Sequence, residues 1–250
     1  MSGSWNSSAP WLWLVASATI AVTSVSAAVL RRWSAWHALS GVAAGVLIGA
    51  AASSLRNPLS SMASYTAALM VLNLWVPPLL LASVPASTWA SWRGVPAPAA
   101  ARGLAGWLLD PWVAASVFVL LSVMVSLPGI FEPALVNALF SAPLGIAELC
   151  SGLLFWCQLF RCLRAIRHDW QAGLFVLLGT MPMMAVAVVW MFSQNVLYMP
   201  YLNVICQWNV PPLVDQHWAG FVMLFAGLPL QIVGMWRLAG LGSVQRAAAG

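Results

Sequence analysis

The run Gln171–Phe192, QAGLFVLLGTMPMMAVAVVWMF, decides the class of fold because it contains no charged residue. An α-helix of about 20 apolar residues crosses the ~30 Å hydrocarbon core of a bilayer. Similar runs recur along the chain, separated by short polar joints. The whole sequence is 62% hydrophobic and 6% charged, whereas a water-soluble surface needs roughly a quarter of its residues charged. We therefore predict an all-α, polytopic membrane protein.

Seven apolar runs predict one integral membrane domain over residues 1–250, a seven-transmembrane-helix bundle. The first run has no basic segment before it and opens with Trp11 and Trp13, so we expect a retained span rather than a cleaved signal peptide. Tryptophans at the ends of several runs are typical of an interfacial aromatic belt. The predicted spans are 11–30, 36–55, 62–84, 107–127, 141–160, 171–192 and 219–240.

The distribution of arginine predicts the orientation. The chain has no lysine, and with an outside N-terminus every arginine except Arg56 falls on the inner side. This bias follows the positive-inside rule. We expect the N-terminus outside, the C-terminus in the cytoplasm, and a bacterial inner (plasma) membrane location. The arginines are Arg31, Arg32, Arg56, Arg93, Arg102, Arg161, Arg164, Arg167, Arg237 and Arg246.

Several classes of function fit the sequence poorly. A retinal Schiff base needs a lysine, and the chain has none. No Ser–His–Asp or HExxH arrangement supplies a nucleophile and a base, so we expect no enzyme. The net charge of +5 lies at the membrane joints and does not indicate nucleic-acid binding. A small channel or transporter using Glu148, Asn73 and Gln158 stays open, although no ring of charges or repeated broken helix supports it.

Glu148 is the only carboxylate placed well inside a predicted span. A charged acid is costly in hydrocarbon, so this side chain faces the bundle, a partner or water, or stays protonated. Two interpretations remain open. It is either a proton-relay or metal-proximal carboxylate, or a neutral acid hydrogen-bonded to a neighbouring helix.

Soft and polar side chains suggest two possible metal ligand sets. Met181 and Met184 share a helix face, and thioethers suit Cu(I), but ordinary gap-filling is the favoured role. Asp215, Gln216 and His217 directly precede the last predicted span. Asp215 and His217 could together bind a metal, but we favour the interpretation in which Asp215 and Gln216 cap the helix that follows. Cys206 has no outer partner, so we expect no structural disulfide.

Four short motifs give the chain a resemblance to the caa3-type cytochrome c oxidase assembly factors over roughly residues 60–240. They are Val76-Pro77-Pro78-Leu79-Leu80 with Pro85; Leu127-Pro128 with Ala134-Leu135; Gly152-Leu153-Leu154-Phe155-Trp156; and Pro212-Leu213-Val214-Asp215-Gln216 with Gly220 and Met223. The resemblance implies a seven-span protein associated with copper delivery to haem–copper oxidases.

The chain departs from that family where the resemblance implies histidines. Two His-x-x-x-His pairs would fall on Tyr65 and Leu69 and on Ser141 and Gly145, and a single histidine would fall on Ser126. These residues do not replace imidazole as copper ligands. We expect Tyr65, Ser126 and Ser141 to lie near the outer surface together with Asp215 and His217.

The favoured hypothesis is a non-enzymatic assembly factor or accessory subunit of a respiratory haem–copper oxidase, without the family's copper site. Its expected partners are membrane lipid and oxidase subunits or another respiratory complex. The first alternative is a copper carrier with a rebuilt outer site, and the second is a channel or transporter using Glu148. The rebuilt copper site would draw on His217, Asp215, Met199, Cys206 and either Met181 or Met184.

Overall fold

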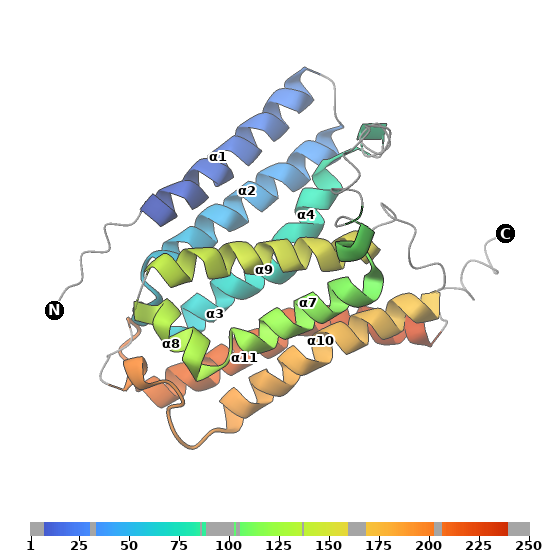
Figure 1. Ribbon diagram of the computed structural model, residues 1–250. Coiled ribbons are helices and arrows are strands. Elements are labelled where there is room, and N and C mark those ends of the chain that lie inside the picture. The colour runs from blue at the N-terminus through green and yellow to red at the C-terminus, as the bar shows by residue number, and fades with distance from the viewer. Residues whose placement is uncertain are drawn as a thin grey trace.

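The apolar runs form the long helices of the protein, whose structure here is a computed structural model. It describes residues 8–30, 34–85, 87–88, 103, 106–136, 138–159, 169–202 and 207–239, and all regular structure within them is helical, as predicted. The helices lie side by side, with α1 at one edge of the bundle and α10 and α11 at the opposite edge (Figure 1). They are α1 (Ser8–Val29), α2 (Ala35–Arg56), α3 (Met62–Met70), α4 (Val76–Ser83), α7 (Pro111–Met124), α8 (Pro128–Val136), α9 (Ala138–Leu159), α10 (Asp169–Phe192) and α11 (Pro212–Leu238), with the short elements η1 (Pro58–Ser60), η2 (Val71–Trp75) and η3 (Met199–Tyr201).

Five of the described helices are long and apolar enough to cross a membrane. A sixth crossing exists if α7 and α8, which meet at a bend of 68°, count as one broken span, and the apolar stretch Pro143–Leu159 of α9 is shorter. The chain is therefore a multi-pass membrane protein with five or six spans by this measure. The seven-span count and the orientation of the termini stay predictions. The five long spans are Trp11–Val29, Ala35–Arg56, Met62–Ser83, Trp170–Phe192 and Pro212–Leu238.

The predicted fourth span differs from the structure at both ends. Helix α7 starts at Pro111, because the Asp110 carboxylate accepts hydrogen bonds from the backbone N–H groups of Trp112 (2.9 Å) and Val113 (3.2 Å). Proline at the first helical position adds to this start signal. The helix ends at Met124, and α8 follows where the sequence predicted a loop.

The predicted third span is not one regular helix. Its middle turn, η2, is a π-helix in which the Val76 N–H donates to the carbonyl of Val71, five residues earlier. Pro77 and Pro78 lack the N–H groups that would bond the carbonyls four residues before them, so the regular ladder is interrupted here. Asn73 lies in this turn and is completely buried.

Small residues allow α1 to pack closely on α2. A Cβ atom on Gly45 would lie 2.9 Å from the Ser17 carbonyl oxygen, and one on Gly41 would overlap the Ser24 side chain. The Ser17 hydroxyl donates to the Gly45 carbonyl at 2.6 Å. Close backbone approach of this kind is a usual means of association between membrane helices.

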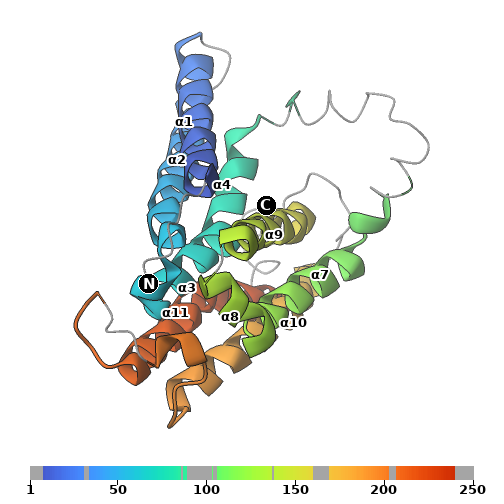
Figure 2. The ribbon, with the colours of Figure 1, turned by 60° about the vertical axis from the view of Figure 1, so that its left-hand side comes forward.

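Helices α10 and α11 form a second close pair, adjacent in both views (Figures 1 and 2). Gly220, Gly227 and Gly234 follow one another at seven-residue intervals on α11, and each meets α10. Gly227 lies under the side chains of Met183 and Met184. Ridges on one helix therefore fit the glycine gaps on the other.

Candidate functional site

Four aromatic side chains fill the end of the bundle where the loops after α2, α7 and α10 meet. Phe131 of α8 is central, with ring centroids 5.7 Å from Tyr65 of α3, 5.9 Å from Trp190 of α10 and 4.6 Å from Tyr198. Trp190 and Tyr198 meet edge to face at 5.7 Å. All four side chains are buried. We call these four residues the aromatic cluster. Aromatic pairs in tilted or edge-to-face contact stabilise the folded protein by more than the burial of their apolar area alone.

Tyr198 fixes the loop after α10 onto the α7–α8 bend. Its hydroxyl donates to the Ser126 carbonyl oxygen at 2.6 Å. Burial raises the pKa of Tyr198 above its usual range, and the nearby Glu132 carboxylate acts in the same direction. The phenol is therefore a neutral hydrogen-bond donor at physiological pH.

Three of the implied histidine positions lie at this cluster: Tyr65 belongs to it, and Ser126 and Ser141 lie beside it. Ser141 lies beside the Tyr65 hydroxyl without forming a hydrogen bond of good geometry, and Ser126 binds Tyr198 through its carbonyl. Deeper in the bundle, Leu69 is buried, and a Cβ atom on Gly145 would lie 3.1 Å from the Trp13 ring. The structure thus gathers Tyr65, Ser126 and Ser141, and packs aromatic and aliphatic groups around them.

Asp215 joins the last helix to the third span. The sequence predicted that Asp215 caps the helix that follows it. Helix α11 begins at Pro212, so Asp215 lies in its first turn and does not cap it. Its carboxylate instead accepts hydrogen bonds from the Ser61 hydroxyl (2.7 Å) and the Met62 N–H (2.5 Å) at the start of α3. A carboxylate at the N-terminus of a helix satisfies unpaired N–H groups and the helix dipole.

Gln216 and His217 hold the loop that follows α10. The Gln216 side chain accepts from the Leu197 N–H at 2.8 Å and donates to the Asn195 carbonyl at 3.3 Å. His217 Nε2 lies 2.9 Å from the Ser193 carbonyl oxygen, so this nitrogen carries the proton and donates. Asp215, Gln216 and His217 therefore all form hydrogen bonds that hold α11 to the start of α3 or to the loop after α10.

The remaining proposed copper ligands do not meet in the described structure. The Met199 side chain is 70% exposed, and its backbone N–H binds Glu132 at 2.9 Å. Met181 is 59% exposed, whereas the Met184 sulfur packs over Gly227. Cys206 lies outside the described residues. Among the residues that are described, no group of three or more His, Cys, Asp and Glu side chains could hold a metal ion.

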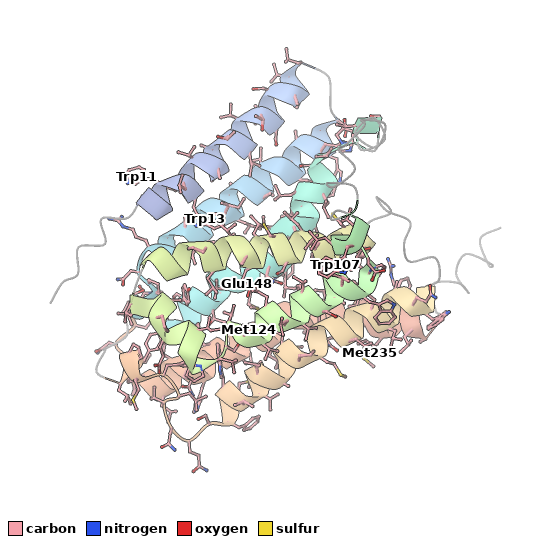
Figure 3. The ribbon with its side chains drawn as sticks, viewed as in Figure 1. Trp11, Trp13, Trp107, Met124, Glu148 and Met235 are labelled. Atoms are coloured by element: carbon pink, nitrogen blue, oxygen red, sulfur yellow. The ribbon has the colours of Figure 1, made fainter. Side chains whose placement is uncertain are left out.

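Glu148 is buried near the middle of the bundle (Figure 3) and faces the π-helical turn. The Asn73 amide donates to the Glu148 carboxyl group and, at 3.2 Å, to the Ser151 hydroxyl, which in turn donates to the Glu148 carbonyl. Asn73 Oδ1 has no partner in the described part of the chain. Glu148 is thus hydrogen-bonded to the third span. Whether it is a neutral structural acid or a proton-relay or metal-proximal carboxylate stays a prediction.

Glycine allows α9 to reach this turn. A Cβ atom on Gly152 would lie only 2.1 Å from the Asn73 carbonyl oxygen and 2.8 Å from Pro77 Cγ. That carbonyl is open toward α9 because Pro77, four residues later, has no N–H to offer it. Two of the motifs that carry the family resemblance therefore contact each other directly.

Copper does not fit the implied histidine positions in this chain. The donors available there are the hydroxyls of Tyr65, Ser126 and Ser141, whereas Cu(I) is selected by soft thiolate and thioether ligands and copper is well suited by imidazole. Leu69 and Gly145 offer no donor atom in their side chains. The aromatic cluster beside them is a packed apolar core.

Comparison with known proteins identifies a family to which the chain is similar. The family described as cytochrome c oxidase caa3 assembly factor matches residues 11–240. Neither a curated protein nor a solved structure matches the chain. Because the match spans nearly the whole sequence and includes every long helix described above, the chain belongs to the cytochrome c oxidase caa3 assembly factor family.

Proposed function

We propose that this protein takes part in building a haem–copper oxidase as a membrane-embedded binding partner, and that it does so without copper at the implied histidine positions. Family membership supports the role in oxidase assembly. The absence of copper is supported by the aromatic cluster, in which the buried Tyr65 ring occupies an implied histidine position and packs against Phe131.

The packing around these positions also resists a return to histidine. At Gly145, an added Cβ would already press on Trp13 and lie 3.5 Å from Leu55 Cδ1, so an imidazole has no room unless α1 moves. At Tyr65, a histidine would leave part of the space against Phe131 empty. The present side chains at these two positions therefore fit the surrounding packing better than histidines would.

The lipid-facing surface offers the area for such contact. Only 11% of the hydrophobic stretch of α1 is buried inside the protein, so most of this helix faces outward. The exposed side includes the large side chains of Val22, Val25 and Val29. We infer that the protein acts as a lasting accessory subunit or assembly partner through helix faces of this kind.

The test is purification from the native membrane in a mild detergent. We expect oxidase subunits and a haem spectrum in a fixed ratio to the protein, and copper at well below one ion per chain after anaerobic loading with Cu(I). Loss of the oxidase subunits would contradict the assembly role. Stoichiometric copper that disappears in a His217→Ala variant would instead establish a copper carrier with a rebuilt site.

A further inference from the structure

A hollow of about 310 Å³ opens between the third span, α9, α10 and α11 on the side of the bundle away from the aromatic cluster. Its described lining residues are apolar apart from one charged side chain, Arg237 in the last turn of α11. We call it the α11 groove. Its lining residues are Leu74, Trp75, Pro78, Trp156, Leu159, Val176, Ala226, Pro229, Leu230, Val233 and Arg237.

The groove has the length of one bilayer leaflet. Its α11 wall runs from Ala226 to Arg237, which at 1.5 Å per residue is about 16 Å. Half of a ~30 Å hydrocarbon core is about 15 Å. An acyl chain lying against Ala226 and Val233 would therefore place its headgroup at the level of Arg237.

Arg237 has no counter-charge among the side chains that the structure describes. It is partly buried and forms no ion pair or hydrogen bond with another described residue. The four acidic side chains that the structure describes are engaged elsewhere: Asp110 caps α7, Glu132 binds the Met199 N–H, Glu148 binds Asn73, and Asp215 binds the start of α3. A partly buried guanidinium favours an anionic partner, and phosphate suits its donor geometry.

The chemistry of the walls narrows the choice of ligand. Among the described lining residues there is no histidine to ligate a haem iron, and none carries a carboxylate or amide side chain. It therefore suits an amphiphile with a long apolar part and one anionic group. We propose that the α11 groove binds an anionic phospholipid of the adjacent leaflet, with an acyl chain along α11 and the phosphate on Arg237.

The experiment is native mass spectrometry of the delipidated full chain, titrated with phosphatidylglycerol or phosphatidylcholine of the same acyl chains. We expect one tightly bound phosphatidylglycerol and weaker binding of phosphatidylcholine. Arg237→Gln should weaken phosphatidylglycerol binding by about fivefold, the effect of one basic residue on an anionic lipid, and leave phosphatidylcholine binding unchanged. Arg56→Gln is the matched control, because Arg56 is exposed and does not line the groove.

A second variant tests the apolar part of the site independently. Ala226→Phe should place a ring in the groove and lower the occupancy of both lipids, with the thermal transition used to confirm that the variant is folded. Equal affinity of the two lipids for the unmodified protein would overturn the proposal. So would an equal effect of Arg56→Gln and Arg237→Gln, or full lipid occupancy in folded Ala226→Phe.

Discussion

The approach of α9 to the π-helical turn predicts a large effect from one added methyl group, in Gly152→Ala. The new Cβ would lie 2.1 Å from the Asn73 carbonyl oxygen, 2.9 Å from the Asn73 carbonyl carbon and 2.8 Å from Pro77 Cγ. Two of these atoms are backbone and the third is in a proline ring, so none can rotate away as a flexible side chain would. The two helices must separate, and the hydrogen bonds of Asn73 to Glu148 and Ser151 must lengthen.

The magnitude follows from two opposing terms. Overpacking a well-packed core typically costs about 1–3 kcal/mol, and backbone atoms on the other side place this case near the upper end. Replacing glycine by alanine inside a helix recovers up to about 1 kcal/mol. We expect a net loss of about 2 kcal/mol. At about 2–4 °C per kcal/mol for a chain of this size, the midpoint of thermal unfolding should fall by about 4–8 °C.

The assay is thermal unfolding in detergent, followed by helical circular dichroism. Gly129→Ala is the matched control, because a Cβ at Gly129 meets no heavy atom within 4 Å. Its midpoint should stay the same or rise slightly. If Gly152→Ala and Gly129→Ala have the same midpoint, α9 does not approach the third span as closely as described here, and the reasoning fails.

Three further outcomes are expected. Asp215→Ala should lower the free energy of unfolding by about 1–3 kcal/mol, because the buried donors at Ser61 and Met62 lose their acceptor; a midpoint within error of the unmodified protein would contradict this. Glu148→Gln keeps an acceptor for Asn73 and should be nearly neutral in denaturant titration, whereas Glu148→Ala should cost about 1–3 kcal/mol. If folded Glu148→Gln instead abolishes oxidase assembly, the acid has a proton-relay or metal-proximal role. Stability should fall as the pH rises above about 10, the ordinary pKa of tyrosine, because the buried Tyr198 hydroxyl has a raised pKa and only the unfolded chain ionises there. Tyr198→Phe should therefore give a shallower decline between pH 9 and pH 11, and an unchanged slope would refute that assignment.

The class of fold could be predicted because composition and apolar length depend on the solvent around the chain. The ends of the helices could not, because they depend on local and distant hydrogen bonds. Asp215 was predicted to cap the helix that follows it, but its carboxylate binds the start of α3, and its partner Ser61 is 154 residues away. No local pattern identifies such a partner. The π-helical turn could be predicted in part. Pro77 and Pro78 indicate that the helix is interrupted, but they do not indicate that the interruption is a π-helical turn.

The aromatic cluster shows a different limit. Tyr65 was singled out only as the occupant of an implied histidine position, and Phe131, Trp190 and Tyr198 were not singled out. A sequence pattern could flag the two aromatic residues that lie in polar joints, Phe131 and Tyr198. It could not show that four segments bring these rings together, because that contact arises only when α8 folds back from α7.

The residues that carry the family resemblance are those that hold the helices to one another. Pro77 interrupts the third span, Gly152 lets α9 meet the interruption, Leu135 of α8 is buried, and Asp215 joins α11 to α3. Each of these roles is satisfied inside the protein and requires no imidazole. These contacts between helices can therefore persist while the implied histidine positions hold other side chains.

It follows that disrupting the contact between helices at Gly152 should impair stability and oxidase assembly together. A conservative change within the cluster, such as Tyr65→Phe, removes a hydroxyl that has no hydrogen-bond partner among the described residues and should leave both intact.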